Sequence, residues 1–233
     1  MTSKLSEYYD ATAAGYDDLH STQTNPEHTR AMELGWPFFE TASSVLDVGS
    51  GTGRSLIWLR NQNKNLRLLG IEPSQGMIDI AKRDLPDAEF RQGNGEAMPY
   101  ESESTDVVIA TGIMHHADHP DRVISEMFRV ARKGILISDH NNYAFGGSLA
   151  RRLRMGLKVS GLLSAATFVR QGFKRQGYSE EDGWWYPYSL FDNYAEIARQ
   201  SSRLYIIPTR PPVGAMGNLL FSQGHFCIVA MKS

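Results

Sequence analysis

The stretch LDVGSGTGRS, Leu46 to Ser55, places glycine at every second position directly after a short apolar run. It passes into the helical pattern SLIWLR, residues 55–60, which is typical of a buried strand leading into a helix. Glycine adopts backbone conformations that other residues avoid and lets a ligand approach the main chain. The free N–H groups of the next helix suit a polar or anionic group. The stretch therefore predicts a ligand loop after the first strand.

Short apolar segments alternate with helical patterns along the rest of the chain. The predicted strands are residues 45–48, 66–71, 89–91, 106–110, 134–138, 204–207 and 225–231. Such alternation predicts an α/β fold with a parallel sheet covered by helices on both faces. The last two strands flank a turn-rich loop without a helical pattern. They predict a hairpin that adds one antiparallel strand.

Composition limits the class of protein. The chain has 233 residues, a net charge of -2 and one cysteine, Cys227. This length suits one large domain or a domain with an insertion, and the charge excludes bulk attraction to nucleic acid. No stretch has the roughly 18 apolar residues of a membrane span, and MTSKLSEYYD lacks the pattern of a signal peptide. We therefore expect a cytoplasmic protein without disulfides.

The spacing of the glycines in this loop limits the class of ligand that it can bind. It reads G-x-G-x-G, whereas dinucleotide sites want G-x-G-x-x-G and a P-loop ends in Gly-Lys-Ser/Thr. Glu72 follows the second predicted strand, where a carboxylate can accept both hydroxyls of a ribose. The pattern therefore predicts a site for an adenosine whose tail is not a pyrophosphate.

Four segments in this order resemble the motifs of class I S-adenosylmethionine-dependent methyltransferases of the small-molecule type. They are VLDVGSGTG (45–53), GIEPSQGMI (70–78), GNGEAMPY (93–100) and DVVIATGIMHH (106–116). The resemblance covers about residues 8–139 and the terminal hairpin. It implies a doubly wound, mostly parallel sheet of seven strands in the order 3-2-1-4-5-7-6, with the last strand antiparallel. It also implies S-adenosyl-L-methionine as the cofactor.

The same resemblance implies roles for individual residues around that cofactor. The glycine loop would line the methionine end, Glu72 would hold the ribose and Met77 would pack on the adenine unless it is only a core residue. Asn94 stands where many members have Asp, and its carbonyl can still accept a hydrogen bond. Tyr16 would cover the sulfonium, unless it and its neighbours Tyr8 and Tyr9 only pack the first helix. The implied cofactor residues are Tyr16, Asp47, Gly49, Ser50, Gly51, Gly53, Glu72, Pro73, Met77, Asn94, Gly95, Glu96, Thr111 and Gly112.

Histidines that follow the fourth and fifth strands are the candidate general bases. His115, His116 and His119 lie in MHHADHP, and His140 lies in SDHNNY. Histidine titrates near neutral pH, which suits removal of a proton from a hydroxyl acceptor. We favour His116 as the residue nearest the acceptor, with His115 and His140 as alternatives. Each could instead bond its own loop, and we expect no metal ion here.

An insertion separates the fifth strand from the hairpin. We expect a cofactor core over residues 1–143, a helical cap over 144–200 and the hairpin over 201–233. Residues 144–179 carry seven basic and no acidic side chains, and Leu149, Leu153 and Leu157 repeat at helical spacing. An aromatic run, GWWYPYSLFDNY, follows at 183–194. The cap could be a solvated lid, a pocket for an anionic or carrier-bound acceptor, or a membrane-surface helix.

Three functions stay open at this point. The first is O-methylation of a small polar biosynthetic intermediate such as a sugar or natural product. The second is C- or O-methylation of a membrane quinone or lipid, with peripheral membrane contact through residues 149–175. The third is a cofactor-binding protein without catalysis. Nucleic acid is not an expected partner, and the chain could be a monomer or a homodimer.

Overall fold

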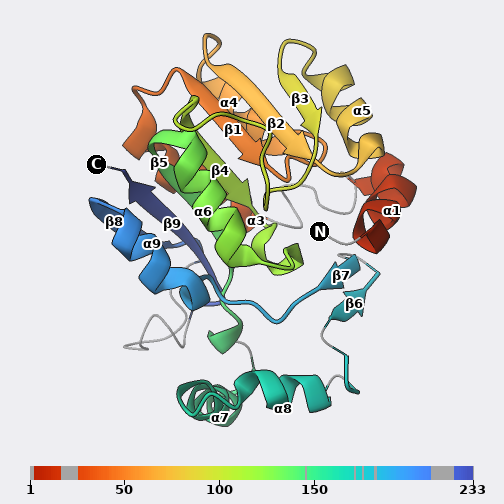
Figure 1. Cartoon of the computed structure of the whole chain (residues 1–233), viewed down its shortest axis with the longest axis vertical. Coiled ribbons are helices and arrows are strands. Elements are labelled where there is room, and N and C mark those ends of the chain that lie inside the picture. The colour runs from red at the N-terminus through yellow and green to blue at the C-terminus, as the bar shows by residue number, and fades with distance from the viewer. Residues whose placement is uncertain are drawn as a thin grey trace.

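The computed structural model describes residues 3–16, 26–144, 146–170, 172–174, 176–180, 183–210 and 223–232. Within them a seven-stranded sheet runs in the order β3-β2-β1-β4-β5-β9-β8 (Figure 1). Its strands are β1 (Ser44–Val48), β2 (Arg67–Glu72), β3 (Glu89–Gln92), β4 (Thr105–Thr111), β5 (Ala131–His140), β8 (Arg203–Pro208) and β9 (His225–Met231). The first five are parallel, and β9 is antiparallel to both β5 and β8.

This topology confirms the predicted fold. Strands β6 (Gly177–Ser179) and β7 (Gly183–Trp185) form a separate two-stranded sheet, so β8 and β9 are the sixth and seventh strands of the main sheet. The chain moves from β1 to β2 and β3 in one direction and from β4 to β5 in the other. Strand order therefore reverses between β1 and β4, where α/β folds bind ligands at the carboxyl ends of the strands. The turn-rich loop predicted between β8 and β9 lies mainly outside the described residues.

Helices cover both faces of the sheet. Successive residues of its central strands point to opposite faces, and apolar side chains on both faces are buried under the helices. Helices α3 (Pro26–Gly35), α4 (Arg54–Gln62) and α5 (Gln75–Asp84) pack on one face. Helices α6 (Pro120–Val130) and α9 (Tyr194–Gln200) pack on the other. Ser74 is the N-cap of α5, and its side chain accepts a hydrogen bond from the N–H of Met77. Serine is a preferred residue at this position.

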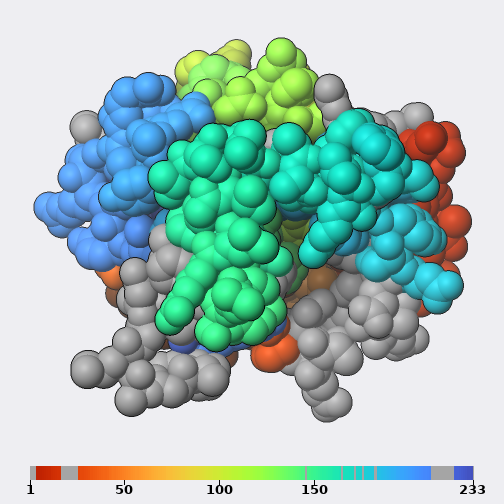
Figure 2. Space-filling model, turned by 90° about the horizontal axis from the view of Figure 1, so that it is seen from below, coloured from red at the N-terminus to blue at the C-terminus, as the bar shows by residue number. Residues whose placement is uncertain are grey.

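The inserted segment contains both exposed and core-packed parts. Helices α7 (Ser148–Val159) and α8 (Leu163–Arg170) spread across the face seen in Figure 2, and no residue of α7 is buried. Further along, Leu190 and Ile197 are fully buried in the core cluster under α6. The packing of residues 190–197 therefore belongs with the core, while α7 and α8 stand apart from it.

The first helix, α1 (Ser3–Thr12), lies over the start of α5 (Figure 1). The carboxylate of Asp10 accepts hydrogen bonds from the Ser74 hydroxyl at 2.6 Å and the Gly76 N–H at 2.9 Å. Ser74 lies between the end of β2 and the start of α5. These hydrogen bonds therefore hold α1 beside the carboxyl ends of the strands.

Candidate active site

The glycine loop has the backbone that its sequence predicts. Gly49, Gly51 and Gly53 all have positive φ, at 67°, 52° and 86°, which side-chain-bearing residues rarely adopt. A Cβ on Gly49 would lie 2.6 Å from the Ile113 side chain. Gly53 ends the turn as the N-cap of α4. The loop thus passes close to the segment after β4 and leaves main-chain atoms exposed to a ligand.

Two buried carboxylates stand at the ends of β1 and β2. Glu72 accepts hydrogen bonds from Gly51 N–H at 3.1 Å and Ser74 N–H at 2.9 Å. Burial raises the pKa of Glu72 to about 7, although these two bonds oppose the shift. Burial and the charge of Glu72 raise the pKa of Asp47 well above its ordinary value. Among the described residues, the Asp47 Oδ1 atom has no hydrogen-bond partner.

A cavity of about 70 Å³ lies against this loop, and we call it the glycine-loop cavity. It brings together residues of α1, the loop, β2, α5 and the segment after β4. The predicted residues that line it are Tyr16, Gly49, Ser50, Gly51, Glu72, Met77, Thr111, Gly112 and His116, together with Tyr9, Thr52, Arg54, Ser55 and Ile113. Sites for small molecules usually offer about 300–1,000 Å³, which is more space than this cavity has with Tyr9 and Tyr16 lining it.

A smaller recess continues beyond Gly49 and Ile113, which line both spaces. It gathers the other predicted adenine-side residues, Pro73, Asn94, Gly95 and Glu96. The Asn94 Oδ1 atom accepts from the Glu96 N–H at 2.9 Å, so this oxygen is oriented by its own turn. Asp47 and Gly53 support the loop from behind and do not line either space.

Aromatic rings from the N-terminal segment cover the glycine-loop cavity. The Tyr9 and Tyr16 rings meet edge to face at 5.8 Å. The Arg54 guanidinium lies over the Tyr16 ring at 5.3 Å. The Tyr16 ring is therefore paired with a protein cation in this structure, and its contact with a sulfonium stays a prediction.

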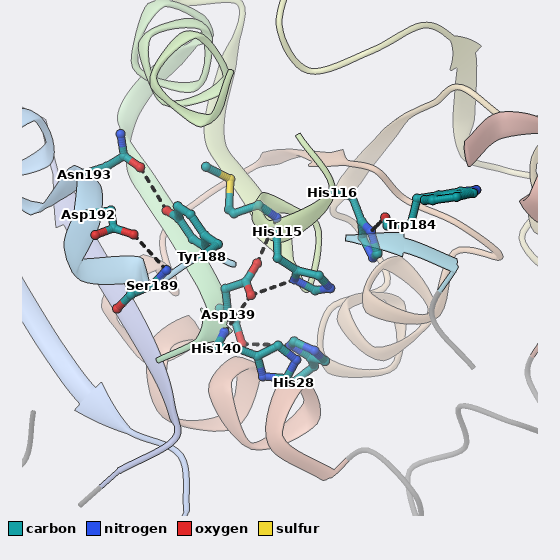
Figure 3. A network of polar contacts seen from close by, with 12 residues as sticks. His28, His115, His116, Asp139, His140, Trp184, Tyr188, Ser189, Asp192 and Asn193 are labelled. Atoms are coloured by element: carbon teal, nitrogen blue, oxygen red, sulfur yellow. Dashed lines mark hydrogen bonds and ion pairs between the residues drawn. The ribbon is translucent and has the colours of Figure 1, made fainter. Parts of the chain in front are cut away.

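Histidines from three segments, His28, His115 and His140, lie around Asp139 near the end of β5 (Figure 3). Ring centroids are 4.0 Å apart for His115 and His116, 5.1 Å for His115 and His140, and 5.6 Å for His140 and His225. His28 from α3 lies 4.7 Å from His225. Burial lowers the pKa of His28 to about 4, and burial also holds the pKa of His225 well below its usual value.

His116 has both ring nitrogens engaged. Its Nδ1 lies 2.8 Å from the main-chain oxygen of Trp184, and its Nε2 lies 3.1 Å from the Tyr9 hydroxyl. A carbonyl oxygen only accepts, so Nδ1 carries a proton, and Nε2 of the neutral ring accepts from Tyr9. His116 therefore connects the α1 cover to β7, on the side of the glycine-loop cavity.

His115 is oriented by a buried carboxylate. Its Nδ1 lies 2.8 Å from Asp139 Oδ1, while Asp139 Oδ2 accepts from the Met114 N–H at 2.8 Å. Burial raises the pKa of Asp139, but the charge and hydrogen bond of His115 outweigh burial and hold it well below its ordinary range. An ionised Asp139 holds the Nδ1 proton of His115, so Nε2 is the nitrogen that exchanges a proton when the ring passes between its charged and neutral forms.

A second cavity, of about 410 Å³, lies under α7 and α8, and we call it the cap cavity. Its lining comes from the ends of β4 and β5, from α7 and α8, and from the aromatic segment. The residues are His115, His140, Asn142, Ala150, Leu153, Arg154, Leu157, Leu163, Ala166, Thr167, Arg170, Trp185, Tyr186, Pro187 and Tyr188. His115 lines the cap cavity, whereas His116 lines the glycine-loop cavity.

The structure also shows contacts that the sequence reading did not assign. Asp139 orients the histidine at the centre of the site, although it directly precedes the candidate His140. The sequence did contain a signal for this contact. Asp139 lies near the end of the strand that pairs with β4, and the two adjacent histidines follow β4. His115, Asp139 and His140 also place possible ligand atoms within 4.8 Å of one another. Asp139 also accepts hydrogen bonds from the Met114 N–H, His115 and the His140 N–H, and the absence of a metal ion at this cluster stays a prediction.

Comparison with known proteins places the central segment in a family. Residues 46–138 match the model of a methyltransferase domain. A ubiquinone/menaquinone biosynthesis C-methyltransferase, UbiE, of Campylobacter jejuni is 32% identical over 129 residues, which are 52% of this chain and 53% of that protein. A demethylmenaquinone methyltransferase of Renibacterium salmoninarum is 30% identical over 104 residues, 44% of this chain and 43% of that one. The chain thus spans about half the length of these curated relatives or less.

Solved structures share the fold over most of the chain. An S-adenosylmethionine-dependent methyltransferase of Thermotoga maritima, described as a possible histamine N-methyltransferase, has a TM-score of 0.65 at 15% identity, covering 98% of this chain and 100% of that one. A putative S-adenosylmethionine-dependent methyltransferase of Listeria monocytogenes has a TM-score of 0.62 at 15% identity, covering 89% and 99%. At this identity the likeness establishes the fold alone.

Proposed function

We propose that this chain, whose residues 46–138 match a methyltransferase domain, is an S-adenosylmethionine-dependent methyltransferase that O-methylates a small polar biosynthetic intermediate. One observation carries this proposal. Two neighbouring histidines line the two cavities, His116 the glycine-loop cavity and His115 the cap cavity. One cavity has the residues for the cofactor, and the other supplies space and an oriented base for an acceptor.

The donor groups of the glycine-loop cavity fit S-adenosylmethionine. Glu72 has carboxylate lone pairs left for the two ribose hydroxyls after its two main-chain bonds. Tyr16 and Met77 line the same cavity and would contact the cofactor as the sequence predicts. When bound, this cofactor supplies a methyl group activated by its sulfonium.

In the proposed mechanism His115 is the general base. Asp139 holds its Nδ1 proton, so Nε2 can take the proton of an acceptor hydroxyl in the cap cavity. His116 is a positioning residue that ties Tyr9 and the Trp184 main chain around the cofactor side. The aromatic wall of Trp185, Tyr186 and Tyr188 excludes water and orients the acceptor.

The experiment that tests this proposal is calorimetric binding of S-adenosylmethionine and S-adenosylhomocysteine to wild type and Glu72→Ala, followed by acceptor screening. Wild type should bind, and the variant should bind at least 100-fold more weakly, because charged hydrogen bonds contribute roughly 1.5–3 kcal/mol each. Binding without turnover on any screened acceptor favours a cofactor-binding protein without catalysis. No binding by wild type would reject the proposal.

A second candidate is methylation of a membrane quinone or lipid. The names of the two curated relatives favour it, and so does the outer surface of α7 and α8. Leu149 and Val159 are 79% and 83% exposed on a helix that also carries arginines. Among the described residues no helix is long and apolar enough to cross a bilayer. Co-sedimentation with vesicles, followed by turnover on a vesicle-borne quinone, separates this candidate from the first.

A further inference from the structure

The cap cavity has an uneven distribution of charge. Two guanidinium groups line it, Arg154 from α7 and Arg170 from α8, and two histidines line its inner end. None of the described lining residues carries a carboxylate. The other groups of this lining are apolar, aromatic or neutral. A molecule that fills the cavity therefore meets positive charge on the side of the two cap helices.

The two arginines have different environments. Arg154 is half-buried, and its Nη1 donates to the Asn142 main-chain oxygen, which fixes it at the junction between the core and α7. Arg170 is exposed at the end of α8. Burial and the nearby charge of Arg170 lower the pKa of Arg154. Like charges at one cavity are unfavourable by themselves, and an anion between them would relieve the repulsion.

Guanidinium groups are suited to this task because their planar donors match the oxygens of a phosphate or carboxylate. The leucines of α7 and α8 and the aromatic wall suit a flat or apolar body. We propose that Arg154 and Arg170 form an anion subsite for a phosphate or carboxylate of the acceptor, opposite the His115 end of the cap cavity. This inference rests on the proposed function, since it treats the cavity as the acceptor site.

The test uses 1-naphthyl phosphate as the anionic probe and 1-naphthol as its uncharged match, titrated calorimetrically with and without S-adenosylhomocysteine. Arg154→Gln and Arg170→Gln should each weaken binding of the phosphate at least tenfold. Arg152→Gln is the matched control, because Arg152 lies on the same helix, is exposed and does not line the cavity. It should change binding less than twofold.

Each outcome of this experiment supports or overturns the proposed anion subsite. Equal weakening by all three variants, or equal affinity of wild type for naphthol and naphthyl phosphate, overturns it. Because Arg154 also holds α7 to Asn142, Arg170→Gln tests the charge without that contact. Binding of S-adenosylhomocysteine is measured on the same samples. Its failure rejects the proposed function, whereas its success with no phosphate binding rejects only the subsite.

A lipid headgroup offers the same chemistry as a soluble phosphate. Vesicles of phosphatidylglycerol and of phosphatidylcholine distinguish the two sources. Sedimentation with phosphatidylglycerol alone, lost in Arg154→Gln and Arg170→Gln but kept in Arg152→Gln, assigns the subsite to a lipid acceptor. Specific binding of naphthyl phosphate without vesicle binding assigns it to a soluble one. Vesicle binding lost equally in all three variants indicates bulk surface charge and overturns the subsite for lipid.

Discussion

Large apolar side chains are buried in the sheet but exposed on the cap helices. Leu136 and Ile137 of β5 are fully buried, whereas Leu153 of α7 is 64% exposed. The sheet is held by hydrophobic burial and by main-chain hydrogen bonds on both sides of β5. Helix α7 is held by a few contacts, such as those of Arg154 with Asn142 and Lys158 with Asp192.

This difference separates two tasks. The carboxyl ends of the buried strands fix the glycine loop, Glu72 and the histidines in a rigid frame. The cap contributes most of the cap cavity with side chains that add little to folding. On the proposed function, changes in the cap would alter which acceptor binds while the predicted cofactor residues stay in place.

The largest effect is expected at the rigid end of the cap cavity. His115→Gln should lower kcat on an identified acceptor by about 10²–10⁴-fold, the range for a general base, and Asp139→Asn should act in the same direction by releasing the His115 tautomer. His116→Gln should mainly weaken cofactor binding through Tyr9. The exposed His119→Gln serves as the control. A greater kcat loss in His116→Gln than in His115→Gln would reverse the assigned roles.

Removing an apolar side chain should destabilise the protein much more in the sheet than in the cap. Ile137→Ala removes buried methyl groups from a central strand and should lower the free energy of unfolding by about 2–5 kcal/mol. Leu153→Ala should change it by less than about 0.5 kcal/mol, because that side chain is mostly exposed. Urea unfolding measures both. A comparable loss in Leu153→Ala would show that α7 is part of the folding core.

A smaller effect concerns pH. The pKa of Glu72 is about 7 in the folded protein, compared with the ordinary value of 4.5 that applies to the unfolded chain. Its stabilising contribution is therefore complete below pH 4.5 and is lost as the pH rises through 7. Cofactor hydroxyls donate to the ionised form, so S-adenosylhomocysteine affinity should fall by up to about tenfold per pH unit below 7.

Glu72→Gln separates this effect from that of Asp47, whose raised pKa acts in the same direction. Calorimetry between pH 5.5 and 8 should give a shallower affinity profile for the variant, and unfolding of the free variant should depend less on pH. An unchanged affinity profile would mean that Glu72 does not meet the cofactor in its ionised form.

The cofactor side of the fold was predictable because its signals are local. Gly49, Gly51 and Gly53 need positive φ within five residues, and Ser74 caps the helix that begins beside it. Alternating apolar strands and helices then brought these local features to one edge of the sheet. The lining of the glycine-loop cavity agrees with most of the predicted cofactor residues, whose roles stay predictions.

The choice among histidines was not predictable from spacing. His115 and His116 are adjacent, but one ring faces Asp139, which is 24 positions away, and the other faces Tyr9 and Trp184. These partners come together only through strand pairing and through the β6–β7 sheet, which the sequence did not predict. Of the aromatic run, Trp185, Tyr186 and Tyr188 line the cap cavity, while Phe191 packs on Phe226.

The contact between α1 and β7 has a kinetic consequence. Tyr9, His116 and the Trp184 main chain form one continuous path, the Tyr8 hydroxyl donates to the Glu180 oxygen at 2.6 Å, and Lys4 lies over the Trp184 ring. If α1 swings out to admit the cofactor, it must release the strand that leads to the aromatic wall. We therefore expect compulsory-order turnover, in which the cofactor associates first and a competent acceptor site exists only after α1 has closed again.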